Sequence, residues 1–245
     1  TVLRCADPSA PRPAAGQFYM IRAAERWGGG ADERPYLPRA FSVLRAPAHS
    51  DELHFLIEDV GPGTARLCEL VPGNDLMLVG PLGIGFAPPE LGRTALLVGG
   101  GVGIAPLAIW QDQLSDHDCL VLLGFRDAEH GAGAGLLTDP QIATDDGSRD
   151  HHGLVTDLLV SALDTGDQAQ VYACGPPRML EAVRALCAER DVPAQLALES
   201  GMACGYGACF GCVVPTVDGY IRLCVDGPVL DAARLESALT PGAGH

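Results

Sequence analysis

Four of the nine cysteines lie close together near the C-terminus and are spaced like the ligands of an iron–sulfur cluster. The pattern Cys204-x4-Cys209-x2-Cys212-x11-Cys224 is the plant-type arrangement of a [2Fe–2S] cluster. Zinc ribbons usually pair two similar C-x2–4-C units, so a zinc site is the weaker alternative. Glycines between the cysteines let the backbone wrap tightly and point N–H groups at the sulfurs: Gly205, Gly207 and Gly211.

The other five cysteines are scattered through apolar or helix-like segments and are predicted to be mostly inert: Cys5, Cys68, Cys119, Cys174 and Cys187. The opening residues TVLRCADPSAPRP contain no apolar stretch of the kind that a secretory signal carries. A disulfide framework is therefore disfavoured. We expect the clustered thiols to hold a metal centre in the reducing cytoplasm.

A second candidate site is a glycine-rich turn that follows the apolar run ALLV. In the pattern Gly101-x-Gly103-x-x-Pro106, with Gly99 just before it, glycines allow the backbone to approach a pyrophosphate. A helix that begins here would direct its unpaired N–H groups at the phosphates. Proline stands where the usual dinucleotide fingerprint has its last glycine, so a tight turn packed on a neighbouring strand remains an alternative.

The run VYACG ends in a third motif, Cys174-Gly175-Pro176, which precedes a predicted helix. In a doubly wound sheet this position lies over the ligand crevice, where the thiol can touch a planar ring. A buried small residue at a strand end is the alternative, and only the placement of the cysteine favours the functional interpretation.

The fourth motif, Arg39-Ala40-Phe41-Ser42, lies in the N-terminal part of the chain. An arginine can bind a phosphate, an aromatic ring can stack, and a serine hydroxyl can reach a ring nitrogen. Strand alternation produces such a set by chance, so the motif carries weight only in context.

The elements that position these motifs change in character along the chain. Residues 1–91 contain short apolar runs broken by glycine and proline, which predict a small antiparallel β-barrel or sandwich with a helical stretch at 64–70. The polar, glycine-rich residues 24–38 are predicted to form a loop.

Residues 92–199 are predicted to form an α/β domain, because continuous apolar runs such as ALLVGG and CLVLLGF alternate with helical segments. This alternation indicates a parallel sheet with its ligand-binding loops along one edge. Two helices are each expected to turn one apolar face to the sheet: Leu107, Trp110 and Leu114 in the first, and Met179, Val183 and Leu186 in the second.

Residues 200–245 are predicted to form a small third unit around the clustered cysteines. Glycine and cysteine dominate here, and the segment is too short to fold on a core of its own. Metal ligation would supply the missing stability. The expected fold class is therefore a multi-domain chain that combines a β-barrel, an α/β domain and a cluster module.

Composition excludes several classes of partner. With 31 acidic and 16 basic side chains the net charge is −15, which repels nucleic acid and anionic membrane surfaces. The uncharged stretch 94–111 is long enough to suggest a membrane span. Four glycines and Pro106 interrupt it, so it is predicted to be a strand, a turn and a helix start.

Taken in order, these motifs resemble those of the ferredoxin–NADP reductase superfamily, which joins a flavin-binding barrel to a nicotinamide domain. The C-terminal part is most similar to electron-transfer subunits of two-subunit, NAD-linked dihydroorotate dehydrogenases. The first barrel strand of that family looks short or absent near residue 1. The resemblance spans nearly the whole chain and rests on ESGMACGYGACFGC (199–212), LCVDGPV (223–229), PLGIGF (81–86), TDDGS (144–148) and VTDLL (155–159).

The resemblance implies three cofactors and one protein partner. FAD would be held by residues of the barrel: Arg39, Ala40, Phe41, Ser42, Ile57, Glu58, Gly63 and Thr64. NAD would meet residues of the α/β domain: Gly99, Gly101, Gly103, Cys174 and Gly175. The [2Fe–2S] cluster would bind Cys204, Cys209, Cys212 and Cys224. The partner would be an FMN-containing dihydroorotate dehydrogenase subunit of pyrimidine biosynthesis, assembled with this chain as a heterotetramer.

The cofactor set is also coherent on chemical grounds. A nicotinamide moves two electrons as a hydride and an iron–sulfur cluster moves one, so a flavin is needed between them. Asp127, which follows the second α/β strand, would repel a 2′-phosphate and favours NAD, whereas the neighbouring Arg126 would favour NADP. Two other functions remain open, namely a subunit of another ferredoxin-linked or electron-bifurcating NAD(P) oxidoreductase and a non-enzymatic iron–sulfur sensor.

Overall fold

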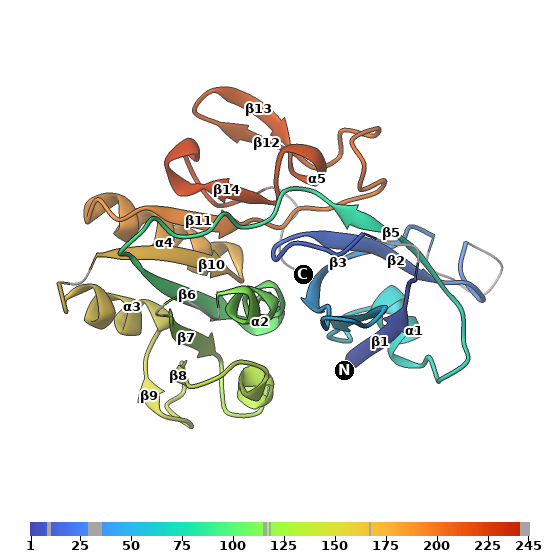
Figure 1. Cartoon of the computed structure of the whole chain (residues 1–245), viewed down its shortest axis with the longest axis horizontal. Coiled ribbons are helices and arrows are strands. Elements are labelled where there is room, and N and C mark those ends of the chain that lie inside the picture. Colours follow the sequence, from blue (N-terminus) through green and yellow to red (C-terminus); the bar gives the residue numbers. More distant parts are fainter. Residues whose placement is uncertain (9–10, 29–35, 115–116, 118, 167, 241–245) are drawn as a thin grey trace.

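Three parts of the chain are visible in Figure 1: a small sheet at the right, a larger sheet with helices at the left, and a C-terminal part that lies above both. This computed structural model describes residues 1–8, 11–28, 36–114, 117, 119–166 and 168–240. Within these residues no helix has the length and apolar character needed to cross a bilayer.

The N-terminal part is a five-stranded antiparallel sheet in the order β1-β4-β3-β2-β5. The sheet is curled and stays open, so the expected barrel is a half-barrel, and helix α2 of the next part packs against its strand β3. The helix expected at 64–70 begins slightly earlier, at Pro62. The elements of this N-terminal part are β1 (Val2–Ala6), β2 (Phe18–Ala23), β3 (Arg39–Arg45), β4 (Glu52–Leu56), α1 (Pro62–Cys68) and β5 (Leu76–Leu82).

The first strand, expected to be short or absent, is present and five residues long. β1 pairs with β4 from Val2 opposite Leu56 to Ala6 opposite Glu52. Its residues alternate, with Leu3 and Cys5 half-buried and the others exposed.

Of the loop predicted at 24–38, residues 29–35 lie outside the described part of the chain.

The second sheet has seven strands in the order β14-β11-β10-β6-β7-β8-β9. All its pairings are parallel except that of β14 with β11, so the sheet is mixed rather than purely parallel as expected. The antiparallel strand comes from the C-terminal part of the chain and pairs with the edge of β11. The strands are β6 (Thr94–Gly100), β7 (Cys119–Phe125), β8 (Pro140–Thr144), β9 (His151–His152), β10 (Ala169–Cys174), β11 (Ala194–Ala197) and β14 (Val229–Asp231).

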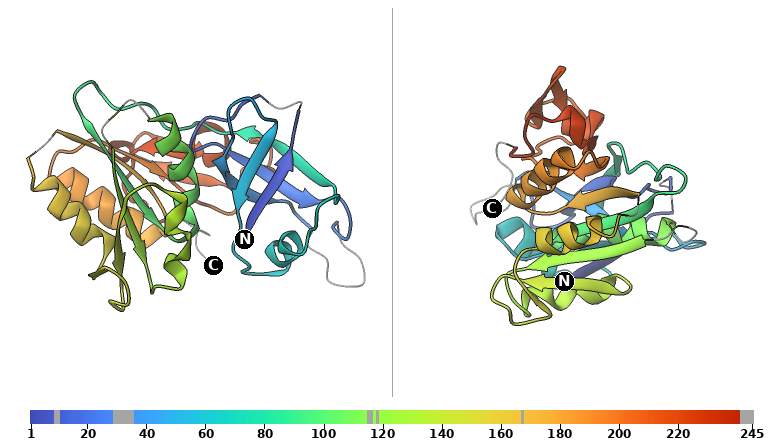
Figure 2. Two further views of the ribbon diagram at one scale, coloured as in Figure 1. Left: turned by 60° about the horizontal axis from the view of Figure 1, so that its bottom comes forward. Right: turned by 90° about the vertical axis from the view of Figure 1, so that its left-hand side faces the viewer.

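Helices cover both faces of this sheet. The left view of Figure 2 shows the green α2 (Ile104–Gln113) on one side and the yellow α3 (Val155–Leu163) and orange α4 (Pro177–Glu189) on the other. The alternation of β6 matches this, since Leu97 faces the core shared with α2 and Leu96 faces the core shared with α3 and α4. The predicted strand, turn and helix start at 94–111 are thus confirmed.

The expected faces of α2 and α4 need correction. All residues from 104 to 110 of α2 are buried, because the helix lies between the larger sheet and β3 of the half-barrel rather than on a sheet alone. In α4 the fully buried face is formed by Leu180, Val183 and Cys187, while Met179 and Leu186 are half-buried beside it.

The cluster module contains the hairpin β12 (Val213–Thr216) and β13 (Gly219–Arg222) and the short helix α5 (Leu223–Asp226). As expected from its size, its described residues, which end at 240, form no separate core. Its buried residues belong to a core that includes Met20 of β2 and Leu196 of β11: Cys212, Val214, Leu223 and Cys224. The right view of Figure 2 shows this red part standing on the edge of the sheet.

Glu181 of α4 fixes the last described residues to the sheet domain. Its carboxylate accepts hydrogen bonds from the Ser237 hydroxyl at 3.0 Å and the Ala238 N–H at 2.6 Å, and pairs with Arg184 at 2.7 Å. Hydrogen bonding from Arg184 is the main reason why the pKa of Glu181 falls to about 2. A carboxyl whose pKa is lowered by folding stabilises the fold above its unfolded pKa, and this contribution is lost as pH falls toward its folded pKa.

We therefore expect Glu181→Gln to lower the free energy of unfolding at pH 7 by roughly 1–2 kcal/mol, allowing for partial solvent screening. The difference from the wild type should shrink as the pH falls from 4.5 toward 2. Urea unfolding at several pH values measures it, with Glu189→Gln on the exposed side of the same helix as the control. Equal losses in both variants would contradict this account.

Candidate functional site

A cleft of about 520 Å³ lies between the half-barrel and the α/β domain. One wall comes from the start of β3 and from residues around α1, and the other from the start of α2 and the end of β10. The segment 197–202, which follows β11 and leads to the first clustered cysteine, completes the lining. Residues of the predicted sites that line this cleft are Arg39, Ala40, Phe41, Ser42, Glu58, Thr64, Gly103 and Cys174.

Arg39 is held in place by its neighbours on the half-barrel side. Its Nη1 atom donates a hydrogen bond to the carbonyl oxygen of Leu37 at 2.6 Å, and its guanidinium lies 5.9 Å from the ring centre of Trp27. A Cβ on Gly63 would lie 2.8 Å from Arg39 Nε, so a larger residue there would displace the guanidinium from this position. The arginine is thereby oriented at the cleft wall with donors available for an anionic group.

Thr64 has a local role in addition to its place in the cleft. Its hydroxyl accepts hydrogen bonds from the N–H groups of Val60 at 2.9 Å and Gly61 at 3.0 Å. These two bonds satisfy backbone donors just before α1 begins. The turn that brings α1 to the cleft is therefore fixed by the threonine itself.

Close backbone packing forms the opposite wall. A Cβ on Gly103 would lie 2.6 Å from the carbonyl carbon and oxygen of Cys174, so glycine allows the start of α2 to lie against the end of β10. Burial, together with the charge of Glu199, raises the pKa of the Cys174 thiol well above its ordinary value. The thiol is therefore neutral and offers a soft packing surface rather than a nucleophile.

Five residues of the predicted cofactor set do not line the cleft: Ile57, Gly63, Gly99, Gly101 and Gly175. Ile57 is 1% exposed and belongs to the core. Gly99 and Gly175 serve packing, because a Cβ would lie within 2.9 Å of Leu107 or within 2.6 Å of Met179 respectively. Their assignments to cofactors stay predictions.

The sequence interpretation missed the segment 198–202 as part of the cleft. This segment follows the carboxyl end of β11, and ligands of open α/β sheets bind at the carboxyl ends of strands. That rule, applied to the predicted strand QLALES, could have found it. The sequence interpretation also missed Phe18 and Pro228. These residues line the cleft because folding brings distant segments of the chain together.

The clustered cysteines lie in two pairs. Cys204 and Cys209 are hydrogen-bonded neighbours, and the sulfur of Cys212 accepts the N–H of Cys224 at 3.5 Å. The second pair is buried, at 3% and 2% exposure, whereas Cys209 is exposed. The N–H of Gly211 also points at the Cys209 sulfur, 3.4 Å away.

The environments of the two pairs differ electrostatically. Burial raises the pKa of Cys204, but N–H groups of Cys209 and Tyr206 outweigh it and lower that pKa to about 6. Burial and the neighbouring Cys212 raise the pKa of Cys224 to about 12. The loop thus already favours a thiolate at Cys204, while Cys224 needs a cation to lose its proton.

Among the described residues, no group of three His, Cys, Asp or Glu side chains is arranged closely enough to hold a single metal ion. Structural zinc requires four ligands around one centre, whereas each iron of a [2Fe–2S] cluster takes two thiolates. Two pairs of cysteines are the ligand set that such a binuclear cluster would need.

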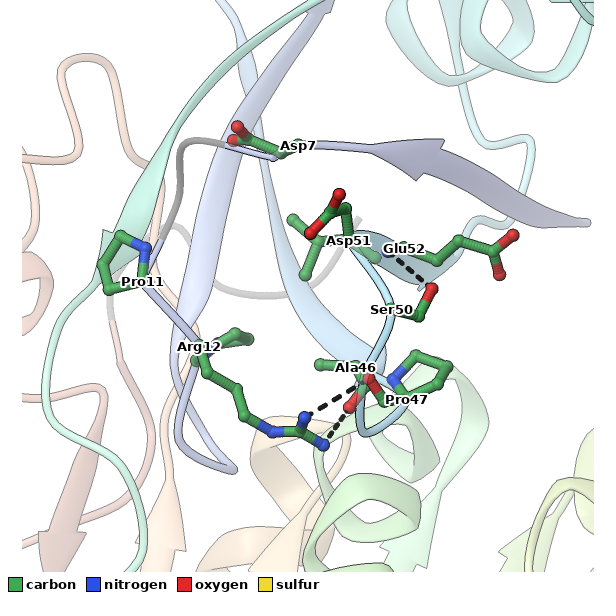
Figure 3. A pocket seen from close by; sticks show the side chains of 10 residues that line it. Asp7, Pro11, Arg12, Ala46, Pro47, Ser50, Asp51 and Glu52 are labelled. Carbon is green, nitrogen blue, oxygen red and sulfur yellow. Dashed lines mark hydrogen bonds between the residues drawn. The ribbon is translucent and has the colours of Figure 1, made fainter.

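A smaller hollow of about 90 Å³ on the half-barrel is shown in Figure 3. Arg12 reaches across it and donates to the carbonyl oxygens of Ala46 and Pro47. Asp51 and Glu52 also line this hollow. Arg12 links the segment before β2 to the loop between β3 and β4, so the hollow is explained by a structural contact.

Comparison with known proteins identifies the family. Residues 199–236 match the iron-sulfur cluster binding domain of dihydroorotate dehydrogenase B. The chain is 35% identical over 224 residues to the electron transfer subunit of dihydroorotate dehydrogenase B (NAD(+)) of Desulforamulus reducens, covering 87% of this chain and 83% of the relative. The chain belongs to this family of electron transfer subunits. The corresponding subunit of Geobacillus thermodenitrificans is 39% identical over 235 residues, covering 90% and 86%.

Solved structures agree with this family in fold. A structure described as the NADH-dependent reduced ferredoxin-NADP oxidoreductase, in work on flavin-based electron bifurcation, matches with a TM-score of 0.81 and 25% identity over 96% of this chain and 84% of that one. A ferredoxin reductase of carbazole 1,9a-dioxygenase matches with a TM-score of 0.60 and 22% identity, over 78% and 61%. The chain thus has a ferredoxin-reductase-like fold.

Gly205 tests the docking of the cluster loop on β2. Its φ is +81°, and a Cβ there would lie 2.3 Å from Met20 Cγ. Gly205→Ala should therefore lower the free energy of unfolding by about 1–3 kcal/mol through overpacking, in addition to the cost of placing alanine at a positive φ. The melting temperature and the iron bound per chain should both fall. Gly73→Ala is the matched control, because its φ is +96° with nothing within 4 Å. If the two variants lose stability and iron equally, the proposed contact has no role.

Proposed function

We propose that this chain passes electrons from a dihydroorotate-oxidising partner through a [2Fe–2S] cluster and FAD to NAD+, as the electron transfer subunit of an NAD-linked dihydroorotate dehydrogenase in pyrimidine biosynthesis. Family membership supports this, since relatives at 35–39% identity carry that subunit's name. The observation that carries the proposal is one cleft whose lining runs directly into the cysteine loop. Met202 lines the cleft, and Cys204 is two residues further along the chain.

The cleft walls suit two different cofactors. We assign the half-barrel wall to FAD, with Arg39 for its phosphates, Phe41 for stacking and Ser42 for the flavin ring. We assign Gly103 and Cys174 on the other wall to the nicotinamide side of NAD. The domains would be 1–91 for FAD, 92–199 for NAD and 200–245 for the cluster.

FAD would exchange single electrons with the cluster and a hydride with the nicotinamide. The protein's own task is then to bind, orient and exclude water. The buried, neutral Cys174 fits that task, because hydride transfer needs no ionised group beside the ring. The start of α2, whose residues are buried, forms part of the apolar lining of the cleft.

The partner would be an FMN-containing dihydroorotate dehydrogenase subunit, joined with this chain in a heterotetramer. The surface near the cysteine loop supports a contact there, because Tyr206 and Phe210 are 62% and 63% exposed and Tyr220 is 79% exposed. Exposed aromatic side chains are enriched at protein interfaces. Docking at this surface would keep the distance between the partner's flavin and the cluster short.

An electron-bifurcating or ferredoxin-linked reductase is the second candidate, and the fold match to the NADH-dependent reduced ferredoxin-NADP oxidoreductase favours it. The identity is lower in that case, at 25% against 35–39% for the dihydroorotate dehydrogenase B subunits. We therefore rank it below the main proposal. No observation favours a non-enzymatic sensor.

The partner assignment is tested by reconstitution. The isolated chain should oxidise NADH with a dye but not oxidise dihydroorotate, and adding the FMN-containing subunit should restore NAD-dependent turnover. Cys212→Ser should stop electron flow between the subunits and leave NADH-to-dye activity largely intact, with circular dichroism confirming the fold. Oxidation of dihydroorotate by the chain alone, or full turnover by the Cys212→Ser complex, would refute the proposal.

Coenzyme preference is tested at Asp127, which follows β7. Its carboxylate accepts the His130 N–H at 2.9 Å, and this hydrogen bond is the main reason why its pKa is lowered. A fixed negative charge here should repel a 2′-phosphate, so kcat/KM should be higher for NADH than for NADPH. Asp127→Asn should lower the ratio of kcat/KM for NADH to kcat/KM for NADPH. A higher kcat/KM for NADPH in the wild type would assign the decisive role to the adjacent, exposed Arg126.

A further inference from the structure

Arg222 occupies the position where the two cysteine pairs meet. It is the last residue of β13 and directly precedes α5, which carries Cys224. In the hairpin it pairs with Val213, the residue after Cys212. The N–H of Leu223 also donates to the carbonyl oxygen of Cys212 at 3.1 Å. The backbone of Arg222 is therefore fixed to the buried pair.

Its side chain reaches the other pair. Arg222 Nη1 donates a hydrogen bond to the carbonyl oxygen of Gly207 at 3.1 Å, inside the loop between Cys204 and Cys209. The guanidinium also lies over the ring of Phe210, 5.2 Å from its centre. One side chain thus contacts the outer loop on both sides of Cys209.

The fit between this side chain and the loop is close. Gly207 has a φ of +87°, and a Cβ there would lie 2.7 Å from Val225 Cγ2 and 3.2 Å from Arg222 Nη1. On its other side, the arginine is steadied by Asp226, whose carboxylate accepts the Arg222 N–H at 2.9 Å and lies 3.9 Å from Nε. The side chain is 34% exposed. The geometry of the Arg222 side chain is therefore set by three groups of the module: the Gly207 carbonyl, the Phe210 ring and the Asp226 carboxylate.

The charge of Arg222 is unusual for its surroundings. Residues 200–245 contain only one other arginine, Arg234, and no lysine. Arg234 is exposed and lies in the 3₁₀ helix Ala232–Arg234, which follows β14. In a chain with a net charge of −15, Arg222 thus places a positive charge in direct contact with the cysteine loop. A guanidinium stays protonated at every pH at which the protein is folded.

We propose that Arg222 is a positioning residue for the [2Fe–2S] cluster: it aligns the outer cysteine loop with the buried pair, and its charge favours the reduced cluster. The inference rests on the proposed function, because it presupposes that cluster. A cluster bound by four thiolates is an anion that gains a further negative charge on reduction, and net charge and hydrogen bonding around the sulfurs set its potential.

Two substitutions separate alignment from charge. Arg222→Met removes the charge and the hydrogen bond, whereas Arg222→Lys keeps the charge and loses the planar fork that bonds Gly207 and covers Phe210. Arg234→Met removes one positive charge from the same module without touching the loop and is the matched control. Full-length proteins are compared for iron per chain, for the rate of cluster loss under dilution, and for the midpoint potential in an EPR-monitored redox titration.

We expect Arg222→Met to bind less iron and to have a more negative cluster midpoint potential than the wild type. Arg222→Lys should lose its cluster faster than the wild type while keeping a potential near the wild-type value. Arg234→Met should leave the iron content and the rate of cluster loss unchanged and shift the potential less than Arg222→Met does. A purely structural residue would change iron content without moving the potential.

A wild-type potential in Arg222→Met, or an equal shift in Arg234→Met, overturns the proposal. If Arg222→Met binds no iron and its potential cannot be measured, the comparison of Arg222→Lys with the wild type decides. Faster cluster loss at an unchanged potential supports the proposal, and wild-type cluster retention overturns it. Absence of iron from the wild-type chain would instead refute the proposed function, so the two failures are distinguishable.

Discussion

The burial of α2 on both sides is the packing constraint on which the rest of the structure depends. Its residues 104–110 join the core of the half-barrel to that of the larger sheet, so the two parts share one continuous apolar core. The aromatic rings of Phe86, Trp110 and Tyr172 meet within that core, with centres 5.4–5.7 Å apart. Because α2 and β3 are packed together, the cleft between their first residues has a fixed width.

A second shared core determines where the cluster module lies. The module buries Cys212, Leu223 and Cys224 against residues of both sheets and has too few apolar residues for independent folding. The segment after β5 contributes a further contact, since the Ile84 N–H donates to the carbonyl oxygen of Gly227. The cysteine loop therefore takes its position from the same two sheets that form the cleft, and the distance between cleft and loop is set by packing.

Local patterns predicted most of this fold, and contacts between distant segments account for the errors. The run ALLVGGGVGIAP encodes a strand, turn and helix, and the structure has each of them. The open half-barrel could not be foreseen, because it depends on α2 covering strands far away in sequence. The antiparallel β14 depends likewise on a three-residue segment that gains its partner only in the folded chain. The spacing of the cysteines predicted a cluster site, but the role proposed for Arg222 could be inferred only from its contacts in the folded chain.

Cys174 and Cys204 show how the fold gives one residue type two different environments. Burial keeps the Cys174 thiol protonated, so under the proposed function it would lie beside a nicotinamide without reacting. Backbone N–H groups lower the pKa of Cys204 to about 6, which favours the thiolate that an iron ligand must be. Cys174 is the last residue of β10, and residues 198–202 lead from the end of the neighbouring β11 along the cleft toward Cys204. If the proposed function holds, the nicotinamide and the cluster would therefore lie beyond the ends of two neighbouring strands, where a flavin in the cleft could exchange electrons with both.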